Sequence, residues 1–173
     1  MLKRELILNQ VVVFQDLTSE QRGKLAPFFV PCEFEAGQVV FEQGDRADCL
    51  YLIIEGEVAV QFKPDDGPEL TVARVRAGGV VGWSSVVGSP CYTSSIDCVM
   101  HCQMLRVNRD DLRSICAHDP ELGAAVLDRL AIVIAERLRN THSHVLALLE
   151  HGLCVSSKRL VDANRVRSEL IRT

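Results

Sequence analysis

Cysteine and histidine, the side chains that most often act as nucleophiles and metal ligands, are scattered along this 173-residue sequence. No two cysteines form a CxxC pair, and His142 and His144, two positions apart on a predicted helix, point to different sides. The sequence has no GxSxG motif and no Cys/His/Asp group that one fold would gather. We therefore expect no catalytic residues and no metal site. The seven cysteines are Cys32, Cys49, Cys91, Cys98, Cys102, Cys116 and Cys154.

Composition places the chain among ordinary globular proteins, with 47% hydrophobic and 24% charged residues. Its length suits one domain with an extension. The net charge of −4 argues against a protein that wraps nucleic acid with its whole surface. No apolar stretch approaches 18 residues, so no membrane span is predicted. Scattered thiols without a signal peptide indicate reduced cysteines and a cytoplasmic location.

Regularly spaced turn residues divide the segment 28–109 into about eight short strands, which predicts an antiparallel sandwich or roll. Within residues 57–63, Val58, Val60 and Phe62 should share one buried face. Residues 49–54 are apolar throughout and should form the most buried strand. The expected strands cover residues 28–35, 38–42, 49–55, 57–63, 69–76, 79–82, 92–100 and 102–108.

Helix signals flank this region on both sides. Residues 1–27 are expected to be helical, with a capping box at Thr18 and Gln21 that starts a short helix. Asn108 is the predicted N-cap of the next helix. Asp119 and Pro120 should start another, which can continue to Gly152.

Apolar residues spaced three or four apart along this last helix form a heptad-like seam. At 1.5 Å per residue the helix would span about 45–50 Å, far more than one small roll can cover. Packing on its own domain explains the first half, and the same helix of a second copy is the simplest partner for the second half. We therefore predict a homodimer. The seam residues are Leu127, Leu130, Ile134, Leu138, Thr141, Val145 and Leu148.

Residues 37–45 (GQVVFEQGD) and 50–58 (LYLIIEGEV) carry a specific resemblance. They resemble the cyclic-nucleotide-binding domain of the catabolite-activator and Fnr (Crp/Fnr) families and of kinase regulatory subunits, with its xxGD turn and LYxIxxG motif. The resemblance covers roughly residues 14–150. An unrelated roll with glycine at its turns is the alternative. The matching positions are Gly37, Gly44, Asp45, Leu50, Tyr51, Gly56, Gly78 and Gly82.

The resemblance implies a fold and a site. The fold is α+β, an antiparallel β-roll (a double-stranded β-helix, similar to a jelly roll) between N-terminal helices and a long C-terminal dimerisation helix. Residues 82–94 match the phosphate-binding cassette, a short helix whose N-terminal amides face the ligand phosphate. Such amides and the helix dipole attract anions. The implied ligand-binding residues are Gly82, Trp83, Ser84, Ser85, Tyr92, Thr93 and Ser94.

Two cassette positions depart from the family pattern. Trp83 stands where the family's cyclic-nucleotide binders have a glutamate that holds the ribose hydroxyl, and Tyr92 stands where they have an arginine that pairs with the phosphate. Losing that charge-assisted bond costs about two orders of magnitude in affinity.

Three interpretations of the pocket remain open. It binds a less charged or aromatic effector, with Trp83 or Tyr92 as a stacking platform. It binds a cyclic nucleotide through Arg74 or Arg76 of the neighbouring strand. Or it is a ligand-free structural domain with Trp83 in its core.

The C-terminal segment bears on DNA binding. Residues 152–173 carry a charge of +3, which leaves −7 on the rest of the chain. This basic segment is most simply a solvated helix face, and a docking segment is the alternative. The family's transcription regulators follow the long helix with a winged helix-turn-helix, whereas residues 157–171 suffice for one helix only. Direct DNA binding is therefore not expected unless the chain is a truncated regulator. Relatives that carry an iron–sulfur cluster need N-terminal cysteines, and none precedes Cys32; haem is a minor alternative.

The sequence as a whole predicts a non-enzymatic sensor domain. Its expected parts are an N-terminal helical segment (1–27), the β-roll (28–109), C-terminal helices (109–151) and a basic tail (152–173). The expected ligand is a cyclic nucleotide or another small anionic or aromatic effector, and no cofactor is required. A structural or adaptor domain that binds a protein partner is the competing hypothesis.

Overall fold

The structure is a computed structural model that describes residue 11, residues 14–136, and residues 138 and 139. The chain divides into two compact units, residues 1–135 and 136–173. The account below concerns the first unit, apart from statements on Leu138. Predictions for residues 1–10 and 140–173 lie outside the described residues. They include the second half of the long helix, the seam residues Thr141, Val145 and Leu148, and the basic tail.

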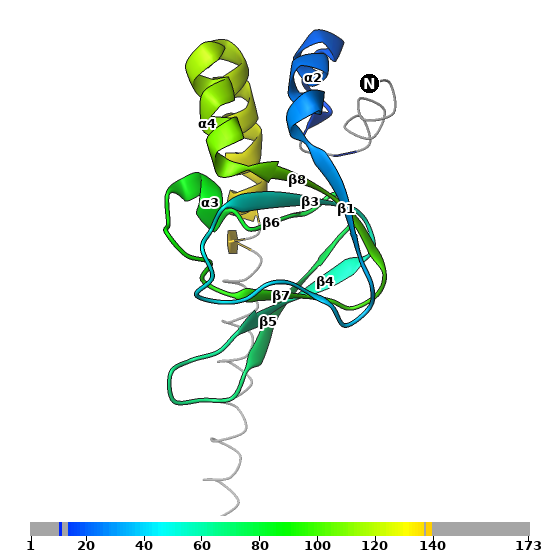
Figure 1. Ribbon diagram of the computed structural model, residues 1–173, viewed down its shortest axis with the longest axis vertical. Helices are drawn as coiled ribbons and strands as arrows, with labels where there is room; N and C mark the ends of the chain where they lie inside the picture. Colours follow the sequence, from blue (N-terminus) through cyan, green and yellow to red (C-terminus); the bar gives the residue numbers. More distant parts are fainter. Residues whose placement is uncertain (1–10, 12–13, 137, 140–173) are drawn as a thin grey trace, which may run out of the picture. The chain divides into compact units, whose positions relative to one another are not determined.

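Eight antiparallel strands form two four-stranded sheets (Figure 1). The first sheet has the order β1-β8-β3-β6 and the second has the order β2-β7-β4-β5. The last two of these eight strands therefore lie inside the sheets: β8 pairs with both β1 and β3, and β7 pairs with both β2 and β4. The strands are β1 (Val30–Phe34), β2 (Val39–Phe41), β3 (Cys49–Glu55), β4 (Glu57–Phe62), β5 (Leu70–Arg76), β6 (Val80–Val81), β7 (Ser95–Cys98) and β8 (Cys102–Asn108).

The helices cover the first sheet on the side away from the second sheet (Figure 1). They are α2 (Ser19–Leu25), the 3-10 helix η2 (Ala26–Phe28), α4 (Arg109–His118) and a helix over residues 120–136. The first sheet is therefore buried on both faces. Leu50 and Leu52 of β3 pack with the helices, while Tyr51 and Ile53 pack with the second sheet. This double burial explains why residues 49–54 of β3 are all apolar, as the sequence predicted.

Two apolar clusters result, and they are named here by position. The helix-side core joins the first sheet to the helices, and the interior core fills the space between the two sheets. Leu130 lies in the helix-side core with 1% of its surface exposed. The side chain of Leu130 is therefore packed against residues of its own chain and cannot contact a second copy, so its prediction as a dimer-seam residue is wrong. Leu127 and Leu138 keep 42% and 66% exposure, and Ile134 is half-buried.

All eight expected strands are present, and β3 and β8 have the predicted bounds. The largest differences are at β1, which starts later because η2 occupies Ala26–Phe28, and at β7. The predicted strand 92–100 contributes only Ser95–Cys98 to β7, because Tyr92 bonds instead to the turn at Gly44 and Asp45. The Tyr92 amide donates to the Asp45 carbonyl at 2.8 Å, and the Gly44 amide donates to the Tyr92 carbonyl at 2.9 Å.

One residue of β4 departs from the predicted face pattern, and the neighbouring strand β5 carries a β-bulge. The register with β5 shifts between Val60 and Gln61. Val58 and Val60 are buried as predicted, but Phe62, beyond the bulge, is 40% exposed. The extra residue of the bulge, Val72, lies on β5, so β4 keeps its own alternation. Phe62 is the last residue of β4 and lies beyond the residues that pair with β7. The expectation that Phe62 is buried with Val58 and Val60 is therefore wrong.

The predicted helix starts are confirmed. At α2 the Gln21 amide donates to the Thr18 hydroxyl at 3.2 Å, and the Thr18 amide donates to the Gln21 side chain at 2.8 Å. The Asn108 side chain accepts from the Asp110 amide at 2.8 Å, and that of Asp119 from the Leu122 amide at 3.1 Å.

Candidate functional site

The cassette is a single turn of helix, α3 (Ser84–Val87), between two glycines in the left-handed region. Gly82 has φ +78°, and a Cβ atom there would lie 2.7 Å from the Cys49 carbonyl oxygen. Gly88 ends the turn with φ +86°. Gly82 therefore meets both a conformational and a steric requirement, because β6 must turn away from β3 without room for a side chain.

The polar groups of this turn bond largely to one another. The Ser85 amide donates to the Gly82 carbonyl at 3.1 Å, and the Val86 and Val87 amides donate to the Trp83 carbonyl at 3.0 and 3.1 Å. The Ser85 hydroxyl, with the residue 1% exposed, also donates to the Gly82 carbonyl, at 2.7 Å. Three amides and one hydroxyl of the cassette, which were expected to face an anion, therefore already donate to carbonyls within the turn. Ser85 lies in the predicted turn, but its hydroxyl is one of these engaged donors.

Tyr92 is part of the interior core. It is 5% exposed, and its ring stacks on Phe41 with centroids 3.7 Å apart and planes at 17°. Its hydroxyl donates to the Cys49 carbonyl at 2.7 Å and accepts from the Cys49 amide at 3.0 Å. Burial raises the pKa of Tyr92, so the phenol remains neutral. Tyr92 therefore joins the cassette to β3 by neutral hydrogen bonds.

The other cassette side chains face different surroundings. Trp83 is half-buried and packs against the helix-side core, away from Tyr92 and the interior core. One of the three interpretations has Trp83 in the core; the core that it contacts is the helix-side core. Thr93 is exposed, Ser94 is half-buried and Ser84 is 6% exposed. Among the cassette side chains, Trp83, Thr93 and Ser94 therefore keep access to solvent.

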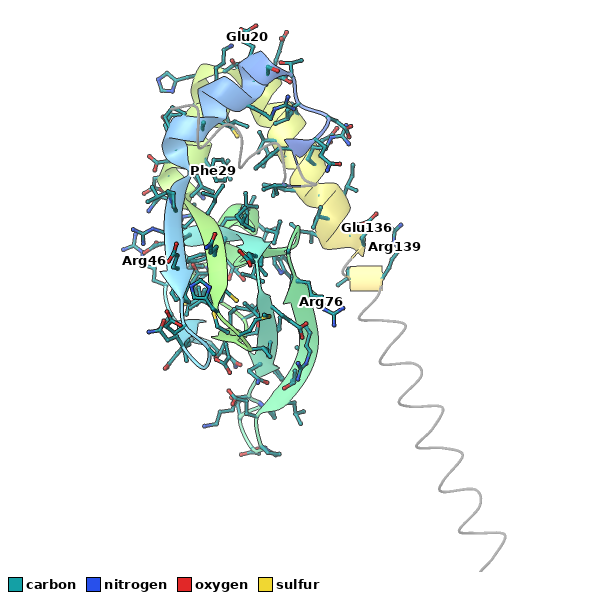
Figure 2. All side chains as sticks on the ribbon, turned by 90° about the vertical axis from the view of Figure 1, so that its right-hand side faces the viewer. Glu20, Phe29, Arg46, Arg76, Glu136 and Arg139 are labelled. Atoms are coloured by element: carbon teal, nitrogen blue, oxygen red, sulfur yellow. The ribbon has the colours of Figure 1, made fainter. Side chains whose placement is uncertain are left out.

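Arg74 does not reach the roll interior. Along β5, Ala73 and Val75 pack on the interior core, so Arg74 and Arg76 lie on the outer face, where Figure 2 shows Arg76 directed away from the roll. Both bond to Glu57: Arg74 Nη1 lies 3.1 Å from Oε1, and Arg76 Nε lies 2.7 Å from Oε2. The hydrogen bond from Arg76, and then that from Arg74, hold the pKa of Glu57 below its usual value. The prediction that Arg74 binds the ligand is therefore wrong.

The partners of Arg74, Arg76 and Tyr92 were not predicted from the sequence. The hairpin register pairs Glu57 with Arg76, and Ala59 with Arg74. Alternation of apolar and basic residues over positions 73–76, at the end of β5, was a signal that Arg74 and Arg76 share the face opposite to that of Ala73 and Val75. No comparable signal announced the stacking of Tyr92 on Phe41, because their contact joins segments about 50 positions apart.

The cysteines offer little reactivity. Six lie in the described part of the chain, all free. Burial raises the pKa of Cys32 to about 11 and that of Cys98 to about 12, so both thiols stay protonated. Within the same residues, no group of three or more His, Cys, Asp or Glu side chains could hold a metal ion. None of the helices described here has the length and apolar character needed to cross a membrane.

Comparison with known proteins places this geometry in a family. The profile of the cyclic nucleotide-binding domain matches residues 31–119. A CRP-like cAMP-activated global transcriptional regulator of Mycobacterium tuberculosis is 29% identical over 143 residues, which cover 83% of this chain and 62% of the relative. The chain thus spans less than two thirds of that regulator's length.

Solved structures agree with this result. A cyclic nucleotide-binding domain from Methylobacillus flagellatus has a TM-score of 0.74 and 26% identity, over 83% of this chain and 81% of that chain. A regulatory subunit of a cAMP-independent protein kinase A from Trypanosoma brucei has a TM-score of 0.65 and 23% identity, over 75% of this chain and 47% of that chain, and shares the fold. The α+β roll, its glycine corners and the profile match agree, and the chain belongs to the cyclic nucleotide-binding domain family.

Proposed function

We propose that this chain is a non-catalytic regulatory domain whose cassette senses a small effector other than a cyclic nucleotide. The observation that carries the proposal is Tyr92, a neutral residue bonded to Cys49 at the position where the resemblance expects a phosphate-binding arginine. An effector that depends on a guanidinium clamp would be bound about two orders of magnitude more weakly here. A neutral or aromatic effector would not suffer this loss.

The surrounding charges support the same conclusion. Arg74 and Arg76 are both engaged by Glu57 on the outer face, so neither is at hand to replace the arginine. Trp83 supplies no carboxylate for a ribose hydroxyl. The proposed contacts are therefore the accessible cassette positions, with Thr93 and Ser94 as hydrogen-bonding groups and Trp83 as an apolar edge.

Calorimetric titration tests the proposal. We expect cyclic AMP and cyclic GMP to show no saturable binding up to about 1 mM, because the charge-assisted bond is missing. Binding of either nucleotide in the low micromolar range would overturn the proposal.

A thermal-shift screen of neutral and aromatic metabolites tests the positive part. An effector at the cassette should raise Tm, and Thr93→Val should reduce that shift. Thr71→Val, the same change at an exposed position of β5, is the matched control and should leave the shift intact. An effector whose shift ignores Thr93→Val would contradict the cassette as its site.

A homodimer formed by the helix that starts at residue 120 completes the proposal. Its support is the exposure of Leu127 and Leu138, two apolar residues of the expected seam. We also propose a cytoplasmic location, and the free thiols of the described cysteines are consistent with it. A protein partner is part of the proposal and direct DNA binding is not. Sedimentation equilibrium measures the oligomeric state, and a monomer at all concentrations would remove this part.

An adaptor domain without an effector is the second candidate. The stacking of Tyr92 on Phe41, which fills interior space beside the cassette, favours it. The two candidates differ in the thermal-shift screen, since an adaptor gives no shift with any small molecule yet still binds its protein partner.

A further inference from the structure

A cavity of about 190 Å³ lies outside the roll interior, where the cassette turn meets the helices. Ser85 and Val86 of α3 line one side, Arg109, Leu112 and Arg113 of α4 line another, and Leu127 of the following helix closes it. Figure 1 shows α3 beside the start of α4. Neither Tyr92 nor Phe41 lines this cavity, so it is separate from the interior core.

Arg109 is the unusual residue of this cavity. Its side chain is 18% exposed, and its Nε is fully buried without a hydrogen-bond partner in the described part of the chain. The nearest carboxylate oxygen, of Asp110, is 4.0 Å away, and that side chain is 77% exposed. A buried, unbonded guanidinium nitrogen is costly, and an exposed carboxylate at this distance compensates little. Because Nε itself has no access to solvent, an acceptor in the cavity bonds to it only after the Arg109 side chain, which lines the cavity, turns toward the ligand.

Arg113 adds a second guanidinium. It follows Arg109 by four positions on α4, so the two side chains leave the helix on the same face, and both line the cavity. Guanidinium groups match the two oxygens of a carboxylate, with two parallel hydrogen bonds. The charged end of the cavity therefore suits a carboxylate.

The rest of the cavity is apolar. Val86, Leu112 and Leu127 contribute hydrocarbon walls, and Val86 also packs against the helix-side core. An enclosed apolar cavity of about 150 Å³ holds a benzene ring, so the volume of this more open cavity is sufficient for a ring of that size. A bare inorganic anion would leave these walls uncovered, whereas an anion that carries a ring or a short branched chain would cover them.

We propose that this cavity binds a small organic carboxylate, with its charged group on Arg109 and Arg113 and an apolar body of about benzene size against Val86, Leu112 and Leu127. The site is additional to the cassette effector site. Because Ser85 and Val86 belong to the cassette turn, the ligand contacts the cassette at the helix junction. Binding of the carboxylate and binding of a cassette effector are then thermodynamically coupled, and the coupling is reciprocal.

Calorimetry and ligand-observed NMR on the full chain, with benzoate as the probe and benzyl alcohol as its neutral counterpart, test this site. We expect saturable binding of benzoate, and at least about tenfold weaker binding of benzyl alcohol, because charge-assisted bonds are lost. Benzoate that does not saturate below about 10 mM, or benzyl alcohol that binds equally well, overturns the proposal.

Variants locate the binding. Arg113→Gln removes one guanidinium at an exposed position, and Leu127→Trp fills the cavity; each should weaken benzoate binding about tenfold or more. Arg106→Gln, an exposed arginine of β8 outside the cavity lining, is the matched control and should have no effect. Circular dichroism verifies that each variant is folded, and sedimentation verifies that Leu127→Trp, at a residue of the expected seam, leaves the oligomeric state unchanged.

Binding that survives both Arg113→Gln and Leu127→Trp contradicts the site. Thr93→Val separates this result from the cassette proposal, because it should leave benzoate binding unchanged. Failure of one proposal is therefore distinguishable from failure of the other.

Discussion

Tyr92→Phe removes one oxygen atom and tests whether Tyr92 holds the cassette to β3. The phenylalanine ring can keep the stacking on Phe41, at a centroid distance of 3.7 Å. What is lost is the pair of hydrogen bonds to the backbone of Cys49, at 2.7 and 3.0 Å. The amide and carbonyl of Cys49 would then lack these partners beside the interior core.

The structure sets the size of the effect. An unsatisfied buried polar group costs about 1–3 kcal/mol. Cys49 is half-buried, so water partly replaces the lost partner and the lower part of this range applies. We expect a loss of about 1–2 kcal/mol in the free energy of unfolding. For a chain of this length each kcal/mol lowers Tm by about 2–4 °C.

Urea denaturation followed by the fluorescence of Trp83, the only tryptophan, measures the loss. Tyr51→Phe is the matched control, since Tyr51 belongs to the same ring cluster and its hydroxyl has no hydrogen bond within the described residues. It should cost less than about 0.5 kcal/mol. Equal losses for the two variants would refute the role assigned to the Tyr92 hydroxyl.

Three further predictions concern the scaffold. Gly56→Ala, at φ +101° with atoms 2.6 Å from the new Cβ, should cost about 2–5 kcal/mol in denaturation, whereas Gly88→Ala, at φ +86° in open space, should cost about 1–2. Glu57→Gln should reduce the loss of stability on acidification, measured by urea midpoints at several pH values. The lowered pKa of Glu57 gives stability that is present above the usual glutamate pKa of about 4.3 and is lost as the pH falls below it. Leu130→Ala should lower the free energy of unfolding by about 2–5 kcal/mol at every protein concentration. Leu138→Ala should change it by less than about 0.5 kcal/mol and should weaken self-association in sedimentation. The reverse pattern would return Leu130 to the dimer seam.

Local signals predicted most of the fold because they act over a few residues. The capping box at Thr18, the cap at Asn108 and the glycines between strands depend on neighbours in sequence, and all were found in place. The register shift at Val60 was beyond such reasoning. A bulge is decided by how two strands fit side by side, and the sequence of β4 alone does not contain that information.

The site was predicted less completely than the fold. The position of the cassette followed from the glycine pattern, but the direction of each side chain depended on distant partners. Arg74 could have been placed correctly from the alternation of β5. Tyr92 and Trp83 could not, because the sequence does not show which of two cores a buried aromatic residue joins. Their separation leaves the cassette between the two cores.

The position of the last two strands has a consequence for the order of folding during synthesis. Within the described part of the chain, β1 pairs only with β8 and β2 only with β7, so the first strands to leave the ribosome wait for the last. At roughly 5–20 residues per second, that wait lasts several seconds. Closing such long loops is slow and depends on contacts that form late. Nascent chains that end before Ser95 therefore expose the apolar strand β3 without its partner β8, and the roll should close in one late, cooperative step.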